Sequence, residues 1–94
     1  MREETLCFPM DDSQILLGKK RKGFGEGKLN GFGGKPEMGE TIKQATIREL
    51  KEECGLITEE ANLRNMAYLV FLFPEKPEWS RAVNVFVTKK WQGR

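Results

Sequence analysis

The chain has 94 residues, of which 38% are hydrophobic and 32% charged, and its formal net charge is +2. This length allows one small domain over residues 1–94, and the composition is that of a soluble globular protein. The longest apolar stretch, residues 66–73, is far too short to span a membrane, and the first residues lack the apolar run of a signal peptide. These features favour a cytoplasmic protein without a membrane partner.

The residue types that are present limit the chemistry. The chain has no histidine and only two cysteines, Cys7 and Cys54, which do not form a Cys-x-x-Cys pair. Zinc sites of the usual Cys/His kind and catalytic triads that need histidine are therefore excluded. Any catalysis must use carboxylates, lysines, hydroxyls or a bound hard metal ion.

The first predicted elements are two short strands at residues 5–10 and 14–19. The turn signal at residues 11–13 lies between them, so an antiparallel hairpin is expected. A loop with several glycines follows over residues 20–34, where the backbone can approach a ligand closely or adopt positive φ. This loop is the first candidate for a binding element.

One helix is predicted over residues 42–54. Thr41 and Gln44 form a T-x-x-Q capping box at its start, and Gly55 suits a left-handed C-terminal cap. The apolar face that should pack on the core is formed by Ile47, Leu50 and Cys54. Two longer strands, 66–73 and 81–88, flank a proline-marked loop beyond the helix. Strands on both sides of one helix predict an α+β or α/β domain with the sheet packed on the helix.

A second face of this helix carries three glutamates. Glu49, Glu52 and Glu53 lie at positions i, i+3 and i+4, with Ile42 and Ala45 further along the same side. Carboxylates this close repel one another unless a cation lies among them, and oxygen ligands suit Mg²⁺, with Mn²⁺ as an alternative. The ordinary alternative is a solvated acidic face. No lysine follows these glutamates at i+4, as such a face would favour.

Residues 34–56 read GKPEMGETIKQATIRELKEECGL, which fits the Nudix box G-x5-E-x7-R-E-U-x-E-E-x-G-U. The fixed positions are filled by Gly34, Glu40, Arg48, Glu49, Glu52, Glu53 and Gly55, and the aliphatic ones by Leu50 and Leu56. At average residue frequencies such a match has a chance on the order of one in 10⁸ per starting position. The chain therefore resembles the Nudix hydrolases. The resemblance implies an α+β fold, the α/β/α Nudix sandwich, in which the box helix packs on a mixed β-sheet.

The resemblance also implies a metal site and a catalytic base. By position, the ligands of the divalent cation are Gly33, Glu49, Glu52 and Glu53. One glutamate acts as the general base for a water that attacks phosphorus, and Glu53 is favoured over its rival Glu49. Glu40 and Arg48 are expected to support and orient these ligands.

The segments at residues 16–25 and 27–35 resemble the subgroup that hydrolyses oxidised purine nucleoside triphosphates such as 8-oxo-dGTP to the monophosphate and pyrophosphate. By position, the nucleotide contacts would be Thr5, Lys20, Asn30, Phe32, Gly34 and Lys35. The Asn30 amide offers both a donor and an acceptor to a base, although Asn before Gly is also an ordinary turn pair. Phe71 and Phe73 are further candidates for the base pocket, with core packing as the more ordinary role for at least one of them.

Members of this subgroup continue past Arg94 with another acidic metal ligand, base-reading residues and a C-terminal helix over the sheet, so this helix is expected to be absent here. Three other functions stay open: a Nudix hydrolase of a nucleotide sugar or dinucleotide, a nucleotide-binding module without turnover, and RNA binding through the basic residues 19–22. The last is disfavoured because Phe24 is the one aromatic residue near that run. The expected partner is a nucleotide and not a nucleic acid polymer, and a monomer is expected.

Overall fold

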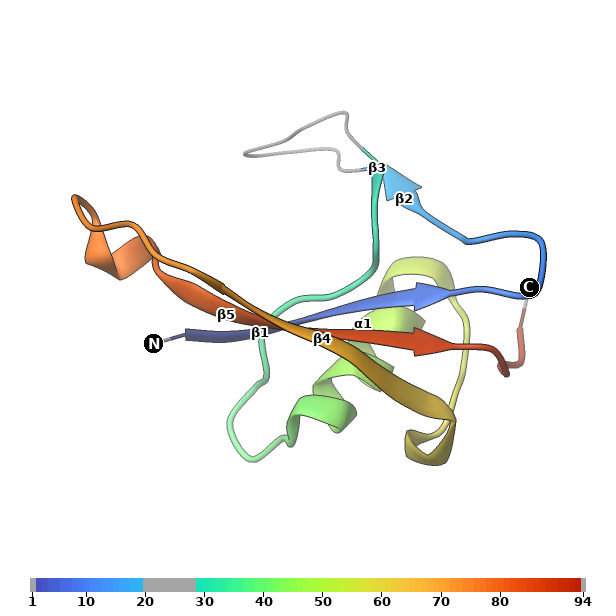
Figure 1. The fold of residues 1–94 in the computed structure, drawn as a ribbon. Helices are drawn as coiled ribbons and strands as arrows, with labels where there is room; N and C mark the ends of the chain where they lie inside the picture. The colour runs from blue at the N-terminus through green and yellow to red at the C-terminus, as the bar shows by residue number, and fades with distance from the viewer. Residues whose placement is uncertain (1, 20–28, 94) are drawn as a thin grey trace.

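The computed structural model describes residues 2–19 and 29–93. Three strands form a mixed sheet in the order β1-β5-β4, namely β1 (Arg2–Pro9), β5 (Arg81–Thr88) and β4 (Leu63–Phe71). β5 lies in the middle, parallel to β1 and antiparallel to β4. Figure 1 shows helix α1 (Ile42–Cys54) along one face of this sheet. The mixed sheet with a packed helix confirms the predicted α+β class.

The predicted hairpin between residues 5–10 and 14–19 is wrong. Its turn does form, because the Asp11 carboxylate accepts hydrogen bonds from the backbone N–H groups of Ser13 and Gln14, both at 2.8 Å. Beyond the turn, the second segment makes one antiparallel bridge and then leaves β1. β1 pairs along its whole length with β5 instead, because that long apolar strand offers more contact than the neighbouring segment does.

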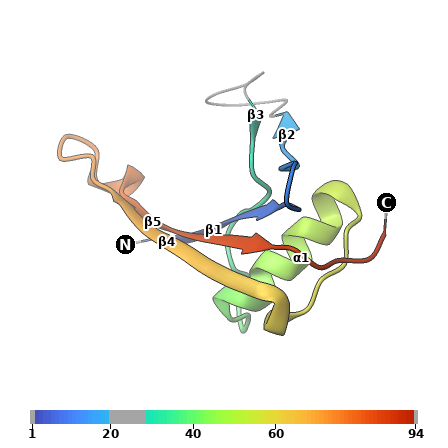
Figure 2. The same cartoon turned by 45° about the vertical axis from the view of Figure 1, so that its right-hand side comes forward.

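The second segment contributes to a separate ribbon. β2 (Gly18–Lys19) pairs antiparallel with β3 (Leu29–Asn30). In Figures 1 and 2 this ribbon stands away from the sheet, on the side opposite α1. The chain between β3 and α1 therefore passes around the edge of the sheet. This passage contains Gly33 and Gly34, which we call the glycine turn.

Helix α1 begins and ends where the sequence predicts. The Thr41 hydroxyl accepts a hydrogen bond from the Gln44 backbone at 3.1 Å, and the Gln44 side chain accepts one from the Thr41 backbone at 3.0 Å. Gly55 closes the helix with φ 79°, and its N–H donates to the Lys51 carbonyl. Two single 3-10 turns, η1 (Glu60–Asn62) and η2 (Pro77–Trp79), complete the described helices. None of the described helices is long and apolar enough to cross a membrane.

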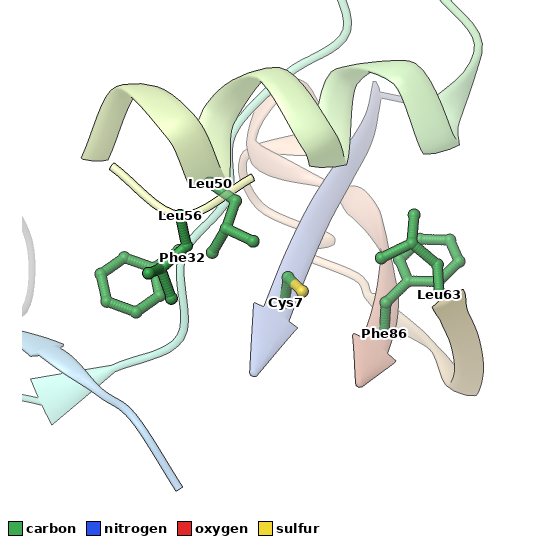
Figure 3. Close-up of a cluster of buried hydrophobic side chains, with 6 residues drawn as sticks. All are labelled: Cys7, Phe32, Leu50, Leu56, Leu63 and Phe86. Carbon is green, nitrogen blue, oxygen red and sulfur yellow. The ribbon is translucent and has the colours of Figure 1, made fainter. Parts of the chain in front are cut away.

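The core lies between α1 and the sheet. Its buried residues are Cys7, Phe32, Leu50, Leu56, Leu63 and Phe86. Figure 3 shows Leu50 pointing from the helix toward the sheet near Cys7, with Phe86 and Leu63 together at the far side of β1. The predicted apolar helix face is confirmed, because Leu50 is fully buried and Ile47 and Cys54 pack against the cluster.

The glutamate side of α1 carries the expected apolar residues in its first half. Ala45, which the sequence places on the glutamate side, is completely buried, and Thr46 beside it is buried too. Ile42 also packs against the core. Ile42, Ala45 and Thr46 therefore anchor the first half of the helix in the core, and the polar side chains that face the loop begin at Arg48.

The last two strands differ in how well the sequence predicts them. β5 has the predicted bounds, whereas β4 begins at Leu63 and ends at Phe71, against a predicted 66–73. The pairing of β4 with β5 shifts between Asn65 and Ala67, which marks a β-bulge. An extra residue at this point breaks the apolar alternation, so the start of the strand is hard to recognise from sequence.

Candidate active site

The candidate site is built on the segment 32–34, which lies against the free edge of β1. Cys7 and Phe32 exchange two backbone hydrogen bonds, at 2.6 and 2.9 Å, and the Thr5 N–H donates to the Gly34 carbonyl at 2.8 Å. A Cβ atom on Gly33 would lie 1.9 Å from the Thr5 carbonyl oxygen. The backbones of Gly33 and Thr5 are in direct contact, so position 33 requires glycine.

The glutamates of α1 reach this turn from the other side. The Gly33 N–H donates to the Glu53 carboxylate, Oε1, at 2.9 Å. A Cβ atom on Gly34 would lie 2.1 Å from Oε2 of Glu49. The absence of side chains at Gly33 and Gly34 therefore lets two carboxylates of the helix approach the loop backbone.

Arg48 joins the helix to the loop that precedes it. Its guanidinium donates two hydrogen bonds to the Glu40 carboxylate, at 2.7 and 3.1 Å, and a third to the Lys35 carbonyl at 3.0 Å. The same group lies 3.2 Å from Glu52 and 3.5 Å from Glu49. A planar donor with several N–H groups suits this arrangement better than lysine would. Arg48 thus fixes the loop and lies beside two of the three helix glutamates.

Two of the glutamates have perturbed acidity. The low solvent access of the Glu49 carboxyl raises its pKa, an effect that Arg48 opposes and Glu52 reinforces. Partial burial also raises the pKa of Glu53, while the Gly33 N–H lowers it and the neighbouring Glu49 and Glu52 raise it. Both shifts have the same largest cause, because restricted access to water disfavours the charged form of a carboxyl group.

A divalent cation fits the donor chemistry of the site. Glu49, Glu52 and Glu53 offer only carboxylate oxygens, which are the ligands that hard cations prefer. Yet within residues 2–19 and 29–93 no three acidic or cysteine side chains converge on one point. Glu53 is hydrogen-bonded to Gly33 and Glu52 to Arg48. Holding a cation would therefore require these two carboxylates to turn toward it.

The residues predicted to contact the nucleotide differ in how deeply they are buried. Thr5 is buried, and its hydroxyl lies 3.4 and 3.5 Å from the Gly34 N and O atoms. Phe32 is 7% exposed and belongs to the core (Figure 3). Lys35 is exposed and contributes its carbonyl to Arg48. Thr5 and Phe32 thus lie at the glycine turn and pack in the protein interior, while they stay candidates for ligand contact.

The remaining candidates lie further along the chain. Asn30 is in β3, where it pairs with Gly18, and Lys20 lies outside the described residues. Phe71 and Phe73 are 45% and 39% exposed, so the expectation that at least one of them packs in the core is wrong. Their exposure leaves both rings accessible to a ligand.

One polar cluster was missed by the sequence reasoning. The Glu3 carboxylate accepts a hydrogen bond from the Tyr68 hydroxyl at 2.8 Å and another from the Asn84 amide at 2.9 Å. Glu3 shares the α1 side of β1 with Thr5 and Cys7, because alternate residues of a strand face the same way. This alternation was the available signal, but the three residues come from three strands whose pairing the sequence does not reveal.

Comparisons with known proteins agree with this geometry. The NUDIX domain family matches residues 2–94. The oxidized purine nucleoside triphosphate hydrolase of Danio rerio is 42% identical over 89 residues, which cover 95% of this chain and 55% of the relative. Its counterpart from Mus musculus is 43% identical over 74 residues, or 79% of this chain and 46% of the relative. The chain therefore spans about half the length of these curated relatives.

Solved structures show the same fold. The MutT NUDIX hydrolase from Burkholderia pseudomallei has a TM-score of 0.86 at 22% identity and covers 99% of this chain and 70% of its own. The mutator MutT protein from Bacillus halodurans has a TM-score of 0.77 at 27% identity, with 100% and 60% coverage. The arrangement of α1 on the mixed sheet is thus shared with longer proteins.

Proposed function

We propose that this chain, which belongs to the NUDIX family, hydrolyses a diphosphate linkage of a nucleotide with the help of a divalent cation. The observation that carries the proposal is the meeting of the helix glutamates with the glycine turn, where the Gly33 N–H contacts Glu53 and Gly34 leaves room for Glu49. A turn without side chains lets phosphate oxygens come close to backbone and carboxylates together.

The substrate class follows from the named relatives. Besides the two oxidized purine nucleoside triphosphate hydrolases, an 8-oxo-dGTP diphosphatase from Buchnera aphidicola is 36% identical over 84 residues, or 84% of this chain and 64% of the relative. We take an oxidised purine nucleoside triphosphate such as 8-oxo-dGTP as the substrate. The products are the nucleoside monophosphate and pyrophosphate, so the bond between the α and β phosphates breaks.

In this reaction Glu53 accepts the proton of the attacking water, and Glu49 is the alternative base. The raised pKa of Glu53 favours this role, because a base with higher proton affinity removes a proton more readily. The proton passes from water to the carboxylate while the water oxygen forms a new bond to one of the two phosphorus atoms. The bond from that phosphorus to the bridging oxygen breaks, and the oxygen leaves with the electron pair as part of the other product. The hydrogen bonds between Arg48 and Glu40 keep the loop fixed against the helix during this step.

The cation would be held by Glu49, Glu52, Glu53 and the Gly33 carbonyl, with Mg²⁺ favoured and Mn²⁺ as an alternative. When bound, it offsets the negative charge of the phosphates and makes the water easier to deprotonate. Glu53 and Glu52 contact Gly33 and Arg48 through one carboxylate oxygen each, so they would turn to offer the cation the other oxygen. We place the reaction in the cytoplasm, where nucleotides are abundant.

The test is hydrolysis of 8-oxo-dGTP by the 94-residue chain, with the monophosphate and pyrophosphate measured by chromatography in Mg²⁺, in Mn²⁺ and in EDTA. Release that needs the cation and prefers 8-oxo-dGTP over dGTP supports the proposal. ADP-ribose belongs in the same panel, because an ADP-ribose pyrophosphatase from Methanocaldococcus jannaschii is 42% identical over 52 residues. Calorimetric binding of 8-oxo-dGTP without products would show a binding module and contradict the catalytic proposal.

A further inference from the structure

Among the strand residues of the described chain, Glu4 is the one carboxylate that faces away from α1. Its neighbour Thr5 and the core residue Cys7 are buried on the α1 side of β1. Because successive residues of a strand point to opposite faces, the Glu4 side chain points to the other face of the sheet. Its side chain is 18% exposed. A charged group therefore lies on this face at a place that a ligand can reach.

Two of the candidates for contact with the base lie on the same side of the sheet. Ala82 of β5 is completely buried toward α1, so its neighbour Arg81 faces the other way. Phe71 of β4 pairs with Arg81 and therefore shares that face with Glu4. Asn30 belongs to β3, and Figures 1 and 2 show the β2–β3 ribbon on the side opposite α1. A carboxylate, an aromatic ring and an amide thus belong to one side of the sheet.

The middle strand separates Glu4 from the aromatic candidate by a distance that suits a flat ring. Glu4 of β1 pairs with Val83 of β5, and Val83 pairs in turn with Leu69 of β4. Phe71 lies two residues beyond Leu69 on the same face. With neighbouring strands ~4.8 Å apart, the backbones of β1 and β4 are about 10 Å apart across β5. A purine base over Val83 can therefore contact the Phe71 ring and turn its edge toward Glu4.

Two arginines hold the Glu4 carboxylate by one of its oxygens. Nη2 of Arg2 lies 3.1 Å from Oε2, and Nη1 of Arg81 donates to the same atom at 3.4 Å. Arg81 is itself fixed, because its Nε donates to the Trp79 carbonyl at 2.9 Å. Within the part of the chain that the structure describes, no residue donates a hydrogen bond to Oε1, and no buried side-chain oxygen lacks a partner. Oε1 is therefore oriented, accessible and ready to accept a hydrogen bond from a ligand.

We propose that Glu4 is a specificity residue of this site, and that its Oε1 atom accepts hydrogen bonds from the N1–H and 2-amino groups of a guanine-type base. The inference rests on the proposed function and adds the residue that selects guanine. A carboxylate only accepts hydrogen bonds, and these two adjacent groups of guanine are both donors. Adenine instead presents the lone pair of N1 at this edge, which a carboxylate repels. Arg2 and Arg81 keep the carboxylate in place for this contact.

The test compares calorimetric binding of 8-oxo-dGMP and of 8-oxo-dIMP, which differs from it only by lacking the 2-amino group. The native chain should bind 8-oxo-dGMP more tightly by about tenfold or more, as expected for a hydrogen bond to a charged group. Glu4→Gln should lose most of this ratio, because the amide offers an N–H group to donors of the base. Glu3→Gln is the matched control, since Glu3 is the next residue of the same strand but faces α1. It should keep the native ratio.

The ratio of the two affinities separates contact with the base from a supporting role in the sheet. If Glu4 only paired with Arg2 and Arg81, Glu4→Gln would weaken both nucleotides equally and leave the ratio unchanged, which overturns the proposal. Equal affinities in the native chain, or no binding of either nucleotide, overturn it as well. The readout does not need turnover. A native ratio that depends on Glu4 without any hydrolysis would sink the proposed function alone, whereas hydrolysis with equal affinities would sink the role of Glu4 alone.

Discussion

The backbone N–H of Gly33 donates a hydrogen bond to the Glu53 carboxylate at 2.9 Å, which ties the last turn of α1 to a loop 20 residues earlier in the chain. In the absence of a cation this amide is the group that offsets the charge of Glu53. A bound cation must compete with it. The glycine turn therefore shapes the site by its backbone, and its two glycines should respond differently to substitution.

Gly33→Ala should destabilise the fold, whereas Gly34→Ala should impair the site. A Cβ on Gly33 meets the backbone of Thr5, and such overpacking costs about 1–3 kcal/mol. A Cβ on Gly34 meets the end of the flexible Glu49 side chain, which can move aside. Thermal unfolding should thus show a lower Tm mainly for Gly33→Ala. Hydrolysis rates should fall for Gly34→Ala at nearly native Tm, and an unchanged rate would show that the position of Glu49 does not matter.

Leu50→Ala should lower the free energy of unfolding by about 2–5 kcal/mol, because it leaves a cavity between the helix and the sheet. Leu50 is fully buried beside Cys7 in the cluster of Figure 3. Urea denaturation followed by circular dichroism measures the change. Met38→Ala is the control, since Met38 is 103% exposed and should lose almost nothing. Similar losses for the two variants would contradict the core described above.

Arg48→Lys should lower kcat/KM by about tenfold or more, because lysine keeps the charge but cannot hold Glu40 and the Lys35 carbonyl at once. Steady-state hydrolysis is the measurement, with Arg64→Lys as the control. Arg64 is exposed on β4 and lies outside the box. A native rate for Arg48→Lys would show that the guanidinium does not position the site.

Glu3→Gln should reduce stability at neutral pH, and this effect should disappear in acid, below the pKa of Glu3 in the folded state. Hydrogen bonds from Asn84 and Tyr68 lower the pKa of Glu3 from its ordinary value of 4.5. Because the pKa is lower in the folded state, this stabilisation is present above the unfolded value and is lost as the pH falls through the folded one. The loss at pH 7 should be at most about 1 kcal/mol, since the group is partly exposed. Equal effects of the substitution at both pH values would contradict the charge-dependent role.

The helix was largely predictable because its signals are local. The capping box at Thr41 and Gln44 and the C-cap at Gly55 fix the bounds of α1 through residues only a few positions apart. The box spacing also brings Glu49, Glu52 and Glu53 to one side of the helix. The contact between Gly33 and Glu53 needed the family resemblance, because no local rule joins a loop to a distant helix end.

The sheet was harder to predict because strand partners are chosen by contacts across the whole chain. Residues 5–10 have an adjacent strand-like segment and a good turn, but those in β1 pair with β5, 79 residues later. Helical spacing likewise gives the faces of α1, with Ala45 on the glutamate side, but not which elements approach each face. The polar cluster around Glu3 joins three strands and could not be seen before their order was known.

The most direct test of the central claim is pyrophosphate release from 8-oxo-dGTP in Mg²⁺ by the native chain, by Glu53→Gln and by Glu60→Gln. Glu60 is an exposed glutamate in η1, outside the box, and serves as the matched control. The predicted result is Mg²⁺-dependent release by the native chain and the control, with a loss of about 100-fold or more in Glu53→Gln. Equal release by Glu53→Gln, or release that persists in EDTA, would contradict the assignment of this helix face as a metal-dependent hydrolytic site.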